Sequence, residues 1–333
     1  MISKAPPHQF PIDFVYLWCD GSDPVFARQK LARMKQANPA LVDENIGDVR
    51  YIQYDELRYA LRSVYTYAPW FRHIFIITNH QRPSWFAEHP KVSIVDHTEI
   101  IPSSLLPTFS SICIEMYLDR IPGLSEHFIY ANDDIMLNRP LEPSDFFSEN
   151  GKPVVWMDRA QEHRITPDVA HKILSDPAIN DWRKTVIRAW SLYRKKSGKP
   201  IRYHQPAHSV DAYSKALFRN VLEKNPELYT ANSAPFRTGN EISRVLFSYE
   251  MVNTFGCQCV FKHKTNLWSR LKNRLAPVEM VAIIHENIKK IKRDIRVFNP
   301  KTVCFNNLTD NSADEAIAYL KKRFPAPAPW EKP

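Results

Sequence analysis

Short apolar runs alternate with helical segments in the N-terminal part of the chain, and this alternation constrains the fold more than any other feature. The runs are rich in β-branched and aromatic residues and have the length of buried strands. Such alternation is typical of an α/β domain with a mainly parallel sheet. The expected strands are Ile12 to Trp18, His73 to Thr78, Val92 to Asp96 and His127 to Ala131, and the expected helices are Asp55 to Thr66 and a segment from Ser110 or Ser111 to Pro122.

Acids and amides directly follow three of the four expected strands. In parallel α/β sheets, ligands bind beyond the carboxyl ends of the strands. A single polar residue at a strand end usually forms a turn, but three such sets at one sheet edge indicate a site. The residues concerned are Asp20 and Asp23 after the first strand, Asn79 after the second, and Asn132, Asp133 and Asp134 after the fourth.

The adjacent acids Asp133 and Asp134 require a positive partner, because neighbouring carboxylates repel and are costly to bury alone. Mg²⁺ takes oxygen ligands, commonly one or two carboxylates with phosphate oxygens and water. Adjacent strand residues point to opposite faces, so one direct ligand is expected, with Asp133 as the first choice. The alternative is that one acid faces the site while the other caps a helix or pairs with an arginine.

The charge of the chain favours an anionic partner. Among 333 residues, 45 are Lys or Arg and 36 are Asp or Glu, which gives a formal net charge of +9. A nucleotide, a phosphorylated polymer, nucleic acid or an acidic membrane surface would each suit this charge. The sequence has seven glycines and contains no P-loop, GxGxxG or GxSxG motif, which argues against P-loop NTPases, Rossmann dinucleotide-binding proteins and α/β-hydrolases.

The five cysteines are widely spaced, which fits a reducing cytosol better than a disulfide framework. The sequence shows no signal peptide and no apolar run long enough to span a bilayer, so any membrane contact is expected to be peripheral. Residues 262–296 are strongly basic and predict either a solvated surface helix or a contact with an anionic lipid or polymer. The Pro-rich tail, "FPAPAPWEKP", is expected to pack as an extended arm or to fray.

Two further residues have suitable chemistry but are weak signals alone. His208, in "QPAHSVDAYSK", could take a proton from an attacking hydroxyl near pH 7. Arg237, in "APFRTGNE", could bind a phosphate with two hydrogen bonds. A lone histidine or arginine is more often structural, so residue types and spacing alone predict an α/β enzyme or binding protein for an anionic ligand.

Four blocks of sequence resemble the Stealth family of sugar-phosphate transferases. This family includes bacterial capsule polymerases and the eukaryotic enzyme that transfers GlcNAc-1-phosphate to lysosomal glycoproteins. The blocks cover most of the chain, and the second is highly specific. They read "IDFVYLWCDGSDP"; "DELRYALRSVYTYAPWFRHIFIITNHQRPSW" through "LPTFSSICIE" to "FIYANDDIMLNRPLEPSDFF"; "PAHSVDAYSK" with "FRTGNEISRVLFSY"; and "KTVCFNNLTD".

The resemblance implies a GT-A-like fold, in which a mainly parallel sheet is flanked by helices and carries a helical insertion. It implies transfer of a hexose-1-phosphate from a UDP-sugar such as UDP-GlcNAc to a glycan hydroxyl, with release of UMP and with Mg²⁺ or Mn²⁺ as cofactor. Nucleic acid is not an expected partner, and the expected location is cytoplasmic, with a possible contact at the inner membrane face. Two alternatives stay open: a GT-A glycosyltransferase that releases UDP, and a non-catalytic phosphoglycan-binding protein.

The resemblance also implies a role for each matched residue. One departure from the family pattern stands out: Asn307 occupies a position where the family usually has Asp, and an amide brings no charge. The implied catalytic residues are His208, Arg237, Asp133 and Asp20; the implied substrate-binding residues are Asp23, Arg58, Arg62, Asn79, Asn132, Glu241 and Asn306; and the implied metal ligands are Asp133, Asp134 and Asn307.

The expected organisation has three parts. Residues 1–160 form the N-terminal α/β part of the catalytic domain, and residues 161–200 form a helical insertion. Residues 201–333 complete the active site and carry the basic helix and the Pro-rich tail.

Overall fold

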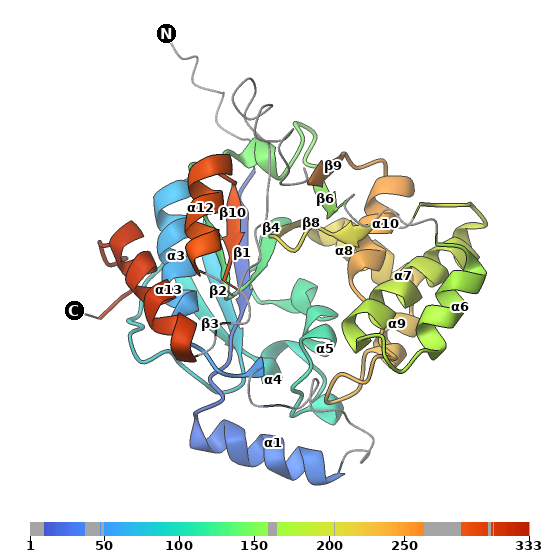
Figure 1. The fold of residues 1–333 in the computed structure, drawn as a ribbon, viewed down its shortest axis with the longest axis horizontal. Helices are drawn as coiled ribbons and strands as arrows, with labels where there is room; N and C mark the ends of the chain where they lie inside the picture. Colours follow the sequence, from blue (N-terminus) through green and yellow to red (C-terminus); the bar gives the residue numbers. More distant parts are fainter. Residues whose placement is uncertain are drawn as a thin grey trace.

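A five-stranded, mainly parallel sheet lies at the centre of the molecule (Figure 1). The computed structural model describes residues 10–36, 47, 50–158, 165–202, 204–262, 288–305, 308 and 310–332. In the sheet order β3-β2-β1-β4-β8, the first four strands are parallel and β8 is antiparallel to β4. The strands are β1 (Ile12–Leu17), β2 (His73–Thr78), β3 (Val92–Asp96), β4 (His127–Asn132) and β8 (Asp211–Ser214).

The four strands predicted from the sequence are all present. Their residues are almost continuously apolar because helices cover both faces of the sheet. Along β1, Phe14 and Tyr16 enter the hydrophobic core on one face, and Val15 enters the core on the other. The structure therefore confirms the α/β class, with a mainly parallel sheet flanked by helices.

Helices from both ends of the sequence cover one face of the sheet, and helices from its middle cover the other. One core contains residues of α3 (Glu56–Tyr67), α12 (Ile288–Phe298) and α13 (Asp310–Arg323). The other contains residues of α5 (Ser111–Glu115), α7 (Asp181–Ser197), α8 (Lys215–Lys224) and α10 (Val245–Asn253). The remaining helices are α1 (Pro24–Gln36), α4 (His97–Ile100), α6 (Pro167–Ser175) and α9 (Glu227–Ala231), with 3₁₀ turns at Ser103–Leu105, Leu118–Arg120 and Pro143–Asp145.

Two small sheets bring late segments of the chain beside early ones. Strand β10 (Thr302–Cys304) pairs antiparallel with β5 (Ile135–Leu137), which directly follows the turn after β4. Strand β6 (Val155–Asp158) lies between β7 (Gln205–Pro206) and β9 (Cys259–Lys262). The N-terminal and C-terminal parts of the chain are therefore interleaved.

The predicted helix from Ser110 or Ser111 to Pro122 is wrong in its length. Ser110 does cap a helix, since its hydroxyl accepts from the amide of Cys113 at 3.4 Å, but α5 ends at Glu115. A 3₁₀ turn, Leu118–Arg120, follows. Almost every residue of this segment is buried, so packing on all sides decides its path rather than a single apolar stripe.

Residues 165–202 contain the expected helical insertion, made of α6 and α7. Asn180 caps the start of α7 through the amide of Arg183, and Gly198 ends it with a φ of 65°. Gly198 can adopt this left-handed conformation without strain because it lacks a Cβ. The domain boundaries at residues 160 and 200 remain predictions.

The basic segment lies partly outside the described residues, which omit 263–287. Within its described part, Ile288, Ile291 and Ile295 of α12 are buried in the core, so protein covers the apolar side of this helix. Lys289, Lys290 and Arg293 are exposed on its other side. An anionic surface would therefore meet basic side chains rather than an apolar helix face. No helix in the described ranges combines the length and the apolar character needed to cross a membrane.

The Pro-rich tail packs against the body of the protein, and we call residues 325–332 the C-terminal strap. Trp330 of the strap is fully buried, and its carbonyl accepts from the amide of Ala87 at 2.8 Å. The Glu331 carboxylate is fully buried and binds Arg58 and Arg62 of α3. The strap therefore fixes α3, whose first residue is Glu56.

Ser63 connects α3 to β5, and its removal is expected to destabilise the protein. The Ser63 hydroxyl donates to the carbonyl of Ala60 and accepts from the amide of Leu137 at 2.9 Å. In Ser63→Ala the buried Leu137 amide loses this acceptor, so the free energy of unfolding should fall by about 1–3 kcal/mol in urea titrations. Thr66→Ala, at an exposed position on the same helix, is the control and should change it by no more than about 0.5 kcal/mol. Equal effects of the two changes would contradict this role of Ser63.

Candidate active site

A cavity of about 900 Å³ opens beyond the carboxyl ends of β1 and β4. The last residues of these two strands, Leu17 and Asn132, are register partners and both line it. The chain continues from β1 to β2 and β3 on one side, whereas β4 lies on the other side of β1. The cavity therefore lies where the strand order reverses, which is the usual ligand position in open α/β sheets.

Three carboxylates line this cavity and lie near enough to influence one another's charge. Asp133 and Asp134 come from the turn after β4, and Glu56 comes from the first turn of α3. Burial raises the pKa of Asp133, and the charges of Asp134 and Glu56 raise it further. Burial also raises the pKa values of Asp134 and Glu56. A cation beside these acids would offset their repulsion, and carboxylate oxygens are ligands that suit a divalent metal ion.

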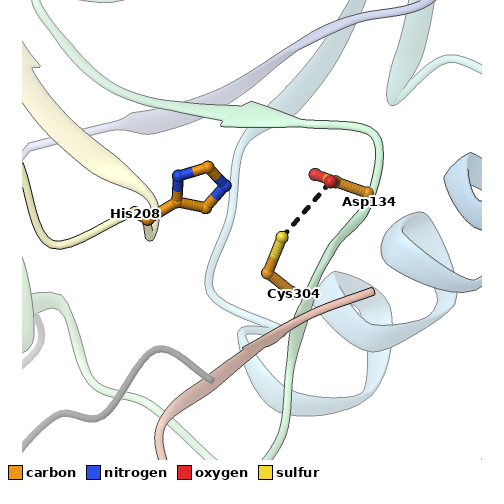
Figure 2. A group of neighbouring side chains, drawn as sticks. All are labelled: Asp134, His208 and Cys304. Carbon is orange, nitrogen blue, oxygen red and sulfur yellow. Dashed lines mark hydrogen bonds between the residues drawn. The ribbon is translucent and has the colours of Figure 1, made fainter. Parts of the chain in front are cut away.

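Asp134, His208 and Cys304 point toward one another from three different segments (Figure 2). Each offers one potential ligand atom, and these atoms lie within 4.8 Å of one another. The Cys304 thiol donates to Oδ2 of Asp134 at 3.2 Å. Oδ1 of Asp134 is buried and has no hydrogen-bond partner in the part of the chain that the structure describes. A buried oxygen of this kind is available as a ligand for a cation.

The backbone of His208 is strained. Its φ of 51° lies in the left-handed region, which residues with a Cβ adopt infrequently. Such strain persists only where the surrounding structure enforces it, and it is concentrated at functional sites. The conformation holds the imidazole at the cavity wall.

Arg237 and Arg244 both line the cavity but differ in their surroundings. Nη2 of Arg237 donates to the hydroxyl of Ser111 at 2.6 Å. Because this hydroxyl is neutral, the contact does not offset the charge of the guanidinium. Arg244 forms ion pairs with Asp211 and Glu115, with 3.3 Å between its Nε and Oε1 of Glu115. Two acids therefore offset the charge of Arg244, and Arg237 is the better cation for an anionic ligand.

The structure brings five of the predicted site residues to this cavity. The remaining predicted residues within the described ranges are not among those that line it. Asn306 and Asn307 lie outside the described residues, although Phe305 and Leu308 on either side of them line the cavity. The five residues at the cavity are Asn132, Asp133, Asp134, His208 and Arg237.

The predicted residues near β1 and β2 have contacts that shape the backbone. Oδ1 of Asp20 accepts from the amide and the hydroxyl of Ser22. Oδ1 of Asp23 accepts from the amides of Val25 and Phe26, which is an N-cap for α1. Asn79 donates its amide to the side chain of Gln29 at 2.8 Å.

The other predicted residues outside the cavity form internal contacts. Arg58 and Arg62 bind Glu331 of the C-terminal strap. Oε1 of Glu241 accepts from the amide and the hydroxyl of Thr238, at 2.8 and 3.0 Å. Because Thr238 follows Arg237 directly, Glu241 closes the turn that carries the predicted phosphate-binding arginine.

Sequence reasoning assigned no site role to six charged residues that line the cavity. A charged residue inside an apolar segment could have indicated a cavity residue from the sequence, as for Glu115 in "SICIEMYL". Burial raises the pKa of Tyr130, and the charge of Glu115, which its hydroxyl contacts, raises it further. These six residues are Arg50, Glu56, Glu115, Asp158, Asp211 and Arg244.

Three comparisons place this chain among known proteins. Family models match residues 10–37 (Stealth protein CR1, conserved region 1) and residues 50–155 (Stealth protein CR2, conserved region 2). The exopolysaccharide phosphotransferase cps2G of Lactiplantibacillus plantarum is 31% identical over 362 residues, which cover 100% of this chain and 98% of that protein. The exopolysaccharide phosphotransferase CpsY of Mycobacterium tuberculosis is 32% identical over 97% of this chain, which spans 58% of the CpsY length. A solved structure of the galactosyltransferase LgtC, with donor and acceptor sugar analogs, has a TM-score of 0.42 and 10% identity, covering 95% of this chain and 98% of that one.

The fold and the cavity define an α/β protein with a cavity at the strand ends, lined by carboxylates, a histidine and arginines. The full-length similarity to cps2G and the two conserved regions then identify the family. The chain belongs to the Stealth family.

Proposed function

We propose that this protein transfers a hexose-1-phosphate, such as GlcNAc-1-phosphate, from a UDP-sugar to a glycan hydroxyl in exopolysaccharide synthesis. The acceptor oxygen attacks the phosphorus that carries the sugar. The bond between this phosphorus and the oxygen that bridges the two phosphates breaks, and UMP leaves with that oxygen. The anomeric bond survives, and the product is a phosphodiester.

The observation that carries this proposal is the convergence of His208, Arg237 and the acidic cluster on one cavity. The imidazole of His208 accepts the proton of the acceptor hydroxyl as the new oxygen–phosphorus bond forms. Transfer of a phosphoryl-type group depends mainly on positioning of the reactants and on stabilisation of the phosphate charge. A base and a fixed cationic side chain are therefore the groups that the protein needs to supply.

Arg237 binds the phosphate that carries the sugar. Its contact with Ser111 and the turn closed by Glu241 fix the guanidinium at the cavity wall. A planar guanidinium can donate two parallel hydrogen bonds to a phosphate, which orients the phosphorus toward the attacking oxygen. Arg244, held by Asp211 and Glu115, shapes the wall beside it.

Asp133 and Asp134 would hold Mg²⁺ or Mn²⁺, with Glu56 as an additional acid nearby. When bound, such an ion offsets the negative charge of the diphosphate. The raised pKa values of the three acids support this assignment, because burial and mutual repulsion favour the neutral forms until a cation is present. The exposed basic side of α12 supports a peripheral contact with an anionic membrane or polymer.

The nucleotide released in the reaction tests this function. The protein is incubated with UDP-GlcNAc, Mg²⁺ and a capsule-type oligosaccharide, and the nucleotide is identified by chromatography. UMP is expected with Mg²⁺ and not with excess EDTA. Release of UDP would instead indicate a glycosyltransferase, and the absence of metal-dependent turnover with a panel of sugar nucleotides would favour a phosphoglycan-binding protein.

Asp133→Asn should lower the rate of UMP release at least about 100-fold, because the amide keeps the shape but removes a charged ligand. Asp314→Asn changes an exposed acid on α13 and should leave the rate unchanged. Equal rates in the two variants would contradict the role of Asp133.

A further inference from the structure

The donor atoms of Asp134, His208 and Cys304 differ in kind from those of a magnesium site. The cluster offers one oxygen, one imidazole nitrogen and one sulfur (Figure 2). Mg²⁺ prefers oxygen ligands alone, whereas thiolate and imidazole ligands favour Zn²⁺ and similar ions. Asp134 therefore belongs both to the acids that line the cavity, with Glu56 and Asp133, and to this mixed group, in which His208 also lines the cavity.

We propose that Asp134, His208 and Cys304 form a zinc-binding site, and that Zn²⁺ bound there inhibits the enzyme. Two ligand atoms of one tetrahedral zinc ion are about 3.3–3.8 Å apart. Sγ of Cys304 and Oδ2 of Asp134 are already 3.2 Å apart, and the widest separation in the cluster is at most 4.8 Å. A side-chain movement of about 1 Å closes this difference, and three protein ligands leave a fourth position for water.

Backbone pairing fixes two of the three ligands in advance. Cys304 ends β10 and is the register partner of Ile135, the residue after Asp134. The amide of Phe305 also donates to the carbonyl of Asp134 at 2.9 Å. The thiol and the carboxylate therefore face each other without any folding step at the moment of binding, which lowers the entropic cost of capturing an ion.

Coordination changes the chemical state of Cys304. The thiol that donates to Asp134 loses its proton to solvent, and the thiolate sulfur binds the ion. A nitrogen lone pair of His208 and one oxygen of Asp134 complete the protein ligands. The buried Oδ1 of Asp134, which has no hydrogen-bond partner within the described ranges, is one oxygen available for this bond.

Inhibition follows from the shared residues, and this part of the inference rests on the proposed function. A His208 nitrogen that binds zinc cannot accept a proton from the acceptor hydroxyl. Asp134 is at the same time withdrawn from its place beside Asp133 in the proposed Mg²⁺ or Mn²⁺ site. Micromolar Zn²⁺ should therefore lower turnover at constant Mg²⁺, and a zinc-selective chelator should restore it.

Cobalt provides a direct readout of the ligands, because a cobalt–thiolate bond has an intense near-ultraviolet charge-transfer band. Co²⁺ is titrated into the full chain without substrate, and Zn²⁺ then displaces it to give its Kd. The wild-type protein and Cys19→Ser should show the band, whereas Cys304→Ser should lose it. Cys19 is the matched control because its thiol lines the same cavity outside the cluster. A band that persists in Cys304→Ser, or no band in the wild type, would overturn the proposal.

His208→Ala gives a second test that does not depend on the thiol. This variant should keep the cobalt–thiolate band but bind Zn²⁺ at least about 100-fold more weakly, since even the loss of a residue that supports a ligand costs 10–100-fold. An unchanged Kd would exclude His208 as a ligand. Circular dichroism confirms the fold of each variant. These binding results stand apart from turnover, so a failure of the transferase proposal would appear as absent UMP with an intact zinc site.

Discussion

Replacing His208 with alanine is expected to lower kcat about 10²–10⁴-fold, which is the usual contribution of a general base. The imidazole faces the cavity from a strained backbone position, beside the acids that precede β5. In the proposed reaction, the acceptor hydroxyl of this variant must lose its proton to water. KM for the sugar nucleotide should change little, because Arg237 and the acidic cluster remain. The measurement is the steady-state rate of UMP formation at saturating donor.

His171→Ala is the matched control for this change. His171 is an exposed residue on α6, away from the residues that line the cavity, so its removal should leave kcat unchanged. The pH profile of kcat gives a second readout. The decrease in kcat at low pH, which reflects protonation of the base, should disappear in His208→Ala. An unaltered kcat and profile would require another base.

The second large effect is expected from Glu331→Gln in the C-terminal strap. The carboxylate of Glu331 is fully buried and accepts two hydrogen bonds from Arg62, both at 2.6 Å, and one from Arg58. Glutamine keeps the volume but leaves the buried Arg62 charge without its counterion. The free energy of unfolding should fall by about 3–5 kcal/mol in urea titrations.

Glu88→Gln tests whether burial causes this effect. Glu88 pairs with Arg82, but its side chain is 80% exposed, so its loss should cost less than about 1 kcal/mol. Burial alone would raise the pKa of Glu331, but hydrogen bonds from Arg62, Ala328 and Arg58 lower it overall. A lowered folded-state pKa means that this stabilisation is complete at neutral pH and declines as pH falls through that pKa. The difference between wild type and Glu331→Gln should therefore narrow in acid, and a pH-independent difference would contradict the ion pair.

The parts of the fold that were predictable are those with a strong local pattern. The runs that became β2 and β3 are short and mainly apolar, and their predicted ends match the observed ones. Strands β5 and β10 have three residues each, too few for a periodic pattern, and they form because they pair with each other. The segment after Ser110 has buried residues all round, so its helical pattern overstated the length of α5.

The residues of the site also divide into those marked by a local sequence pattern and those placed by the tertiary fold. Asp133 and Asp134 were predictable because strand ends in a parallel sheet share one edge, and the resemblance supplied His208 and Arg237. The surroundings of an arginine are not encoded locally: Arg62 binds a carboxylate that lies 269 positions away in the sequence. Glu56 and Arg244 reach the cavity only through the placement of α3 and the start of α10.

The pairing of β10 with β5 has a consequence for the order in which the protein becomes functional. Cys304 and Asp134 are 170 positions apart, and they meet only when the late strand reaches the early one. A nascent chain that has not yet released residues 302–332 from the ribosome carries the carboxylates after β4 but neither the thiol nor the strap that fixes α3. Such a chain lacks one ligand of the proposed zinc site, and it gains the thiol and the strap only once residues 302–332 can fold onto the early strands.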